Sequence, residues 1–116
     1  MKRIYILHTN SNIMKTKADL LKEKEVIFDQ LKQFVSEIIG EDVVEELNVA
    51  SNSIFTKDLE MSSIEIVTFI EKVNNYYGKS VDFSSWLYSM ELDTLINLSL
   101  GAVVDYILES TENNEH

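Results

Sequence analysis

The sequence contains no cysteine and no proline, and it has only three glycines and two histidines. Without cysteine, the chain itself forms no disulfide and supplies neither a thiolate nucleophile nor a thiolate metal ligand. Because proline and glycine are the residues that interrupt helices, their scarcity favours an all-α fold. His8 and His116 stand near opposite ends of the chain, so we interpret them as exposed terminal residues rather than as a metal pair or a general base.

Long hydrophobic runs are missing as well. No stretch approaches the ~18 apolar residues that a membrane-spanning helix needs, and residues 4–7 are too short for the apolar part of a signal peptide. We therefore expect a cytoplasmic protein with no membrane partner. The length of 116 residues fits one domain, which we place at residues 17–109. Residues 1–16 are predicted to be a mobile N-terminal extension, and residues 110–116 a polar C-terminal tail.

Positive charge is scarce over most of the chain. The formal net charge is -10, and the basic residues gather near the N-terminus. From residue 25 onward, four basic residues face eighteen acidic ones. Such a surface repels the phosphates of a nucleic acid and attracts basic patches on other proteins. We expect no nucleic-acid partner and a protein partner rich in lysine or arginine at its docking site.

Apolar periodicity predicts the helices. Apolar residues recur at steps of three and four over residues 18–39 and again over residues 63–77, which is typical of amphipathic helices. Residues 91–97 predict a short third helix, and Ser99 is suited to cap a fourth. The expected architecture is an all-α four-helix bundle with a long first loop, residues 41–61, and a short third helix.

Two glycines and several apolar residues define the connections. Gly40 and Gly78 are predicted to end the first two helices. The first loop is longer than most loops in compact domains, so we expect it to pack on the core through apolar anchors. These anchors are Ile54, Phe55 and Leu59. The aromatic segment at residues 79–89 is predicted to cover the core, with a ligand-lining role as the alternative.

Two adjacent serines precede the second predicted helix. Ser62 and Glu65 have the spacing of a capping box, in which each side chain bonds to the backbone N–H of the other residue. Ser63 would then lie one position inside the helix, beside free backbone amides that accommodate a phosphate well. With no suitable histidine and no G-x-S-x-G elbow, Ser63 is a poor catalytic nucleophile. It is either an ordinary first-turn residue or an attachment point.

Residues 58–65, D-L-E-M-S-S-I-E, resemble the D-L-G-x-D-S-L motif of acyl carrier proteins and related peptidyl carrier domains. In that motif the serine before the aliphatic residue carries 4'-phosphopantetheine. The resemblance implies that Ser63 is the modified serine, that Ile64 stands for the leucine, and that Phe55 belongs to the approach loop. It extends from about residue 18 to residue 107 and includes the helix lengths, the long first loop and the last helix.

The sequence departs from this motif at two positions. Ser62 replaces the usual aspartate, and Glu60 replaces the common glycine. The second helix also has Thr68, Asn74 and Asn75 where carriers of fatty-acid synthesis tend to be acidic. These departures favour a specialised lipid, polyketide or aminoacyl pathway over housekeeping fatty-acid synthesis.

The resemblance implies a function without catalysis. The chain would be a monomeric carrier that holds acyl or aminoacyl intermediates as thioesters on the 4'-phosphopantetheine arm of Ser63. Its partners would be a phosphopantetheinyl transferase and acyl-loading and acyl-processing enzymes with basic docking patches. The alternative from another class is an unmodified acidic helical adaptor that binds a basic protein.

Four residues of the second helix are candidates for contact with these partners. Ile64 and Val67 lie beside Ser63 and off the stripe assigned to the core, although packing at the edge of the core is equally compatible with their spacing. Glu65 and Glu71 would supply charge complementarity to a basic partner.

Overall fold

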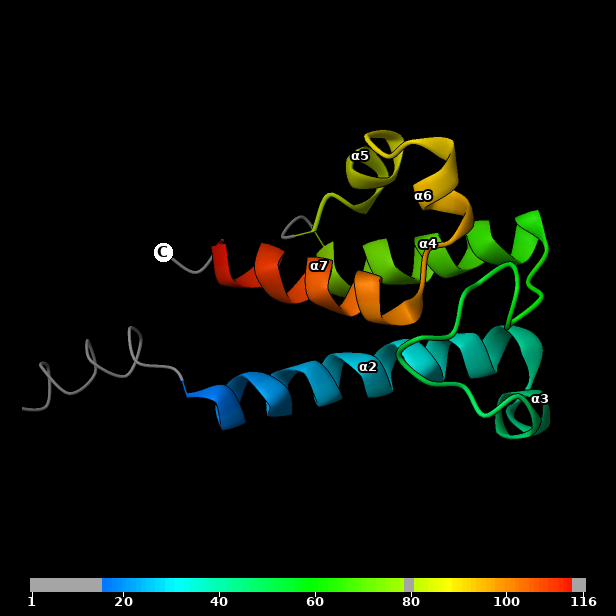
Figure 1. Cartoon of the computed structure of the whole chain (residues 1–116), viewed down its shortest axis with the longest axis horizontal. Helices are drawn as coiled ribbons and strands as arrows, with labels where there is room; N and C mark the ends of the chain where they lie inside the picture. Colours follow the sequence, from blue (N-terminus) through cyan, green and yellow to red (C-terminus); the bar gives the residue numbers. More distant parts are fainter. Residues whose placement is uncertain (1–15, 79–80, 114–116) are drawn as a thin grey trace, which may run out of the picture.

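The computed structural model describes residues 16–78 and 81–113, and within these ranges it contains six helices and no strand (Figure 1). The predicted all-α class is therefore confirmed. The predictions for residues 1–15 of the N-terminal extension and for His8 and His116 lie outside the described residues, whereas Thr16, the last residue of that extension, is the N-cap of the first described helix. In chain order the helices are α2 (Lys17–Ile39), α3 (Glu41–Glu46), α4 (Ser63–Tyr77), α5 (Phe83–Tyr88), α6 (Leu92–Ile96) and α7 (Leu100–Asn113).

The long helix α2 organises the others. It packs against α7, α4 and α3, and α4 in turn packs against α5. Figure 1 shows α2 along one edge of the molecule, α4 and α7 above it, and the short helices α5 and α6 at the opposite edge. The loop between α3 and α4 runs from the α2 edge up to the start of α4.

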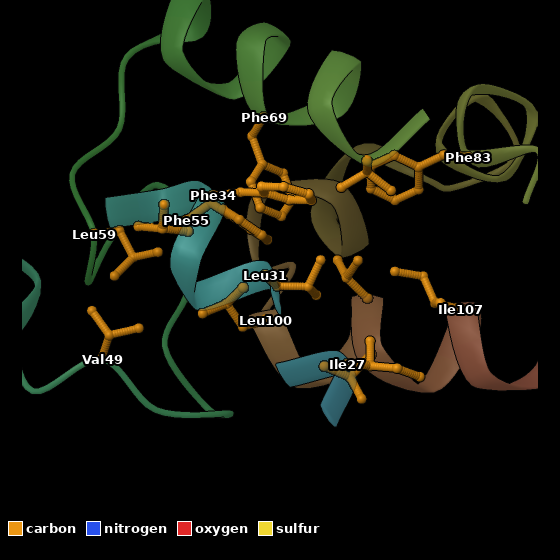
Figure 2. Close-up of a cluster of buried hydrophobic side chains, with 14 of the residues drawn as sticks. Ile27, Leu31, Phe34, Val49, Phe55, Leu59, Phe69, Phe83, Leu100 and Ile107 are labelled. Atoms are coloured by element: carbon orange, nitrogen blue, oxygen red, sulfur yellow. The ribbon is translucent and has the colours of Figure 1, made fainter. Parts of the chain in front are cut away.

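The core lies where α2, α4 and α7 meet the long loop (Figure 2). Its members are apolar residues at the helical spacings seen in the sequence, so burial of these stripes drives the assembly of the helices. The fully buried large side chains are Phe69, Phe83, Leu31, Leu100, Ile107, Val35, Val73 and Val103. Phe55 and Leu59 of the loop are also buried, which confirms them as anchors, whereas Ile54 is half-buried.

Several helix ends lie where the sequence predicted them. α4 spans the predicted range, Gly40 and Gly78 directly follow α2 and α4, and the Ala102 N–H donates to the Ser99 hydroxyl at 3.2 Å, as expected of an N-cap. The helix α7 was predicted to give way to a polar tail, but it continues to Asn113.

The sequence predicted only part of what the aromatic segment before α6 does. It forms the helix α5, which was not predicted, and Phe83 at its start is buried. Trp86 is half-buried and stacks on Tyr106 of α7, with ring centroids 4.2 Å apart. These residues cover the core as predicted. Tyr88 does not, because its side chain is 89% exposed.

The long loop is tied to the start of α7 by backbone hydrogen bonds. The Leu100 N–H donates to the Ser53 carbonyl at 3.0 Å, and the Gly101 N–H donates to the Ser51 carbonyl at 2.7 Å. An isolated antiparallel bridge joins Ile54 and Ser99. A loop of this length is therefore held to the bundle along its middle, and the approach to α4 has a defined path.

Because the backbone of Gly101 lies so close to that of Ser51, we predict that Gly101→Ala destabilises the fold. A Cβ at position 101 would lie 2.9 Å from the Ser51 carbonyl oxygen, so the loop backbone would have to move. Alanine normally stabilises a helix relative to glycine, but here we expect a loss of about 1–3 kcal/mol from overpacking. Urea denaturation measures the change. An equal or higher unfolding midpoint would show that the loop is not packed tightly against α7.

One ion pair links α2 to α4 on the surface. The Lys72 ammonium lies 2.9 Å from a carboxylate oxygen of Glu37, and this hydrogen bond lowers the pKa of Glu37 below its ordinary value. Both side chains are substantially exposed, so the pair contributes little to stability. Partial burial raises the pKa of Tyr77, at the end of α4, to about 12.

Candidate functional site

The start of α4 is built by the predicted capping box. The Glu65 N–H donates to the Ser62 hydroxyl at 3.2 Å, and the Ser62 N–H donates to the Glu65 carboxylate at 2.8 Å. The Ser62 backbone is extended and its carbonyl accepts from the Ile66 N–H at 2.9 Å. Ser62 is therefore the N-cap, and both polar side chains of the box are engaged in holding the helix end.

Ser63 is the first residue of α4, and it is exposed. Among the described residues, no hydrogen bond involves its hydroxyl, whereas the hydroxyl of Ser62 is occupied. The backbone amides of Ser63 and Ile64 occupy the first two positions of the helix, which have no acceptor within the helix itself. The unused hydroxyl therefore lies beside free N–H groups and the positive end of the helix dipole.

The loop before Ser63 is held in place by contacts of residues 58–61. The Asp58 carboxylate accepts from the Ile54 N–H at 2.8 Å and closes a turn. Leu59 and Met61 are buried, and the Met61 N–H donates to the Phe55 carbonyl at 3.0 Å. These contacts set the direction in which the chain enters α4, two residues before Ser63.

Glu60, between those two buried residues, has a positive φ of 48°. This left-handed conformation is the one that glycine adopts readily and that costs other L-residues roughly 1–2 kcal/mol. The glycine of the carrier motif would suit this backbone, and Glu60 adopts the same region despite its side chain. Although Glu60 replaces the glycine of the motif, the backbone at position 60 therefore keeps a conformation that glycine would favour.

This geometry predicts that Glu60→Gly stabilises the protein by about 0.5–1 kcal/mol, because relief of strain exceeds the greater chain entropy of glycine. Asn48 provides a matched control, since its φ is 52° and asparagine tolerates that region better. Asn48→Gly should therefore gain less in the same urea denaturation experiment. A clear loss of stability in the Glu60 variant would contradict the assigned backbone.

The predicted contact residues of α4 have different surroundings. The side chain of Ile64 is 78% exposed and that of Val67 is 53% exposed, so neither packs at the edge of the core. Glu71 is exposed on the next turns of the helix. Glu65 is half-buried, and its carboxylate is shared with the capping box. The exposed apolar residues beside Ser63 are thus available for contact, and Glu71 is the freer of the two carboxylates.

A second group of exposed apolar residues was missed by the sequence analysis. The described part of the chain places Leu92, Leu95 and Ile96 of α6 on the surface. The Thr56 hydroxyl donates to the Ile96 carbonyl at 2.9 Å, so the end of α6 is attached to the loop that leads to Ser63. The spacing of three and four residues between Leu92, Leu95 and Ile96 predicted a helix, but it did not indicate which side of that helix would be exposed.

Neither a metal-binding cluster nor a membrane-spanning helix is found among the residues that the structure describes. No group of three or more histidine, aspartate or glutamate side chains is arranged to hold a metal ion there. Over the same residues, no helix is both long and apolar enough to cross a bilayer.

Comparison of the chain with protein-family models, curated proteins and solved structures finds no significant match. The function is therefore inferred from the residues at the start of α4.

Proposed function

We propose that the protein is a carrier of the acyl carrier type, which holds acyl or aminoacyl intermediates as thioesters on a 4'-phosphopantetheine arm attached to Ser63. It carries out no reaction of its own. It keeps its cargo at a high effective concentration near the enzymes that act on it. The departures from the motif favour a specialised lipid or polyketide-type pathway.

The observation that carries this proposal is the contrast between the two serines. The Ser62 hydroxyl accepts a hydrogen bond that holds the helix end, whereas Ser63 is exposed and its hydroxyl has no hydrogen bond among the described residues. A capping box alone needs only Ser62 and Glu65. The hydroxyl at position 63 is therefore free to serve as a tether.

The residues around Ser63 fit the proposed group. A phosphodiester on its hydroxyl lies beside the free amides of the first helical turn, which favour negative charge. The nearest carboxylate in the helix, that of Glu65, is already hydrogen-bonded to the Ser62 amide. When attached, the arm supplies the thiol on which cargo is held, and the chain has no cysteine of its own to compete for that cargo.

The arrangement of helices supports an acyl-carrier-type bundle. In this interpretation α2, α4, α6 and α7 are its four helices, the long loop after α2 is its first connection, and α6 is its short third helix. The helices α3 and α5 are additions within the connections. The proposed tether then lies at the start of the second principal helix, at the end of the long loop.

The proposed partners are a phosphopantetheinyl transferase and the acyl-loading and acyl-processing enzymes, each with a basic docking patch. Ile64 and Val67 present apolar surface next to the tether, and Glu71 adds negative charge. The net charge of -10 steers such basic partners towards the carrier.

The same exposed residues also favour a second function, that of an unmodified acidic adaptor. Ile64 and Val67 can bind a basic protein whether or not Ser63 is modified. The two functions differ in a single chemical step, the transfer of phosphopantetheine from coenzyme A to the serine oxygen, with release of adenosine 3',5'-bisphosphate.

Incubation with coenzyme A and a broad-specificity phosphopantetheinyl transferase tests the proposal. The carrier function predicts that the intact mass of the chain increases by one phosphopantetheine group. The adaptor function predicts no change in mass with any of several transferases, while binding to a basic partner is retained.

A further inference from the structure

A groove runs between the start of α2 and the end of α7. Figure 1 shows these two helix ends side by side, and nearby the Lys24 ammonium of α2 lies 3.1 Å from the Asp105 carboxylate of α7. The groove has a volume of about 540 Å³, within the ~300–1,000 Å³ that is usual for ligand sites. α4 begins with Ser63 at the opposite end of the bundle, so this groove is separate from the candidate functional site.

The floor of the groove is apolar. Ile27 and Leu108, which belong to the edge of the core, line it together with Val26. The side chain of Val26 is 65% exposed, although it shares the groove with two buried residues. Covering this valine removes apolar surface from water and extends the core between α2 and α7.

The rim of the groove is acidic. Asp19 and Glu23 of α2 line it, with Lys22 as the one basic residue among those that do. The end of α7 lies beside them, and the last turn of this helix contains no basic residue. The negative end of the helix dipole therefore adds to the charge of the two carboxylates. A groove of this kind favours an apolar segment that carries positive charge.

The chain that precedes α2 has the complementary chemistry. It contains Lys2, Arg3 and Lys15 and no acidic residue, whereas residues 16–116 contain seven basic residues and twenty acidic ones. The apolar run I-Y-I-L at residues 4–7 directly follows the first two of these basic residues. The aliphatic side chains of this run match the floor of the groove, and the neighbouring positive charges match its rim.

The run at residues 4–7 is close enough in the chain to reach the groove. Thr16 is the N-cap of α2, and the ten residues of helix from there to Val26 extend only ~15 Å. Residues 8–15 span at most about 26–29 Å when extended, so the chain can turn back along α2. A short flexible tether keeps such a segment at an effective concentration of ~1 mM or more, so that even a weak contact is populated.

We propose that residues 4–7 dock in the groove between α2 and α7 of the same chain, with Lys2 and Arg3 against its acidic rim. The run then covers Val26 and closes the end of the bundle where the two helices meet. The expectation of a mobile extension is thereby restricted to the linker at residues 8–15. This contact does not depend on the carrier function, because the groove lies away from Ser63.

A single nitroxide label tests the docking. Because the chain has no cysteine, His8→Cys supplies a unique attachment point next to the run. In the full chain, the nitroxide should broaden the amide resonances of residues 22–27 and 108–111 and leave those at the start of α4 sharp. Val26→Ser should abolish the broadening at the groove. The matched control Leu21→Ser should preserve it, because Leu21 is similarly exposed but lines a different groove.

A mixture of two preparations identifies the occupant of the groove. Isotope-labelled chain without nitroxide is mixed with nitroxide-labelled chain without isotope, and docking within one chain predicts no broadening. Broadening at the groove in this mixture would show that a second copy supplies the segment, which overturns the proposal. Absence of broadening at the groove in the doubly labelled chain also overturns it, as does broadening that Val26→Ser leaves unchanged.

Urea denaturation of the full chain gives an independent measurement. Ile4→Ser/Ile6→Ser/Leu7→Ser should lower the unfolding midpoint by roughly 0.5–1 M, because the run loses its apolar contact with the groove. The control Ile13→Ser/Met14→Ser changes apolar residues of the linker and should shift the midpoint by less than about 0.2 M. Equal midpoints for the two variants would contradict the proposed contact.

Discussion

Replacement of Ser63 by alanine is expected to abolish attachment of phosphopantetheine, because the attacking oxygen is removed. The fold should persist, since the Ser63 side chain is exposed and the capping box is formed by Ser62 and Glu65. The measurement is intact mass after incubation with coenzyme A and transferase, together with a urea denaturation curve. We expect no adduct and a free energy of unfolding within about 0.5 kcal/mol of the wild-type value.

Ser62→Ala is the matched control, and it should give the reverse result. Loss of the N-cap hydroxyl is expected to destabilise the protein by about 1 kcal/mol. Modification should continue at Ser63, more slowly if the helix end frays. An adduct that persists in the Ser63 variant and disappears in the Ser62 variant would show that the tether is Ser62 and not Ser63.

The largest expected effect on stability comes from Phe69→Ala. Phe69 is 1% exposed in the centre of the core, and its ring centroid lies 5.0 Å from that of Phe55 (Figure 2). Truncation removes buried apolar surface and leaves a cavity, so we expect a loss of about 3–5 kcal/mol. Since total stability is commonly only about 5–15 kcal/mol, the variant should be close to unfolding at room temperature.

Val67→Ala tests whether this effect depends on burial. Val67 is two residues away on the same helix, but its side chain is 53% exposed. Urea denaturation should show a change within about 0.5 kcal/mol for this variant. Comparable losses at positions 67 and 69 would contradict the orientation of α4, and with it the exposure of Ser63 on the same helix.

The start of α4 could be predicted from the sequence because its signals are local. Ser62 and Glu65 have the spacing of a capping box, and the apolar positions of α4 give its buried face through a simple helical period. Capping interactions form within one turn, so they do not depend on how the rest of the chain packs. The exposure of Ser63 does not follow from this period, because position 63 lies on the same side of α4 as the half-buried Ile70; it depends on where the packed part of the bundle ends.

The features that the sequence did not reveal depend on tertiary packing or lack a periodic signal. α5 has six residues and is placed by contacts such as the stacking of Trp86 on Tyr106, which are distant in the sequence. The last turn of α7 continues through polar residues that carry no apolar period. The exposure of Leu92 and Ile96 is set by how α6 attaches to the long loop, because so short a helix has no hydrophobic period of its own that fixes its orientation.

The identity of the modified residue tests the proposed function most directly. Proteolysis of the wild-type chain after incubation with coenzyme A and transferase, followed by fragmentation of the peptide that contains residues 58–72, locates the modified oxygen. We predict phosphopantetheine on Ser63 and none on Ser62. An adduct on Ser62, an adduct elsewhere in the chain, or an unmodified peptide with several transferases would contradict the assignment of Ser63 as the tether.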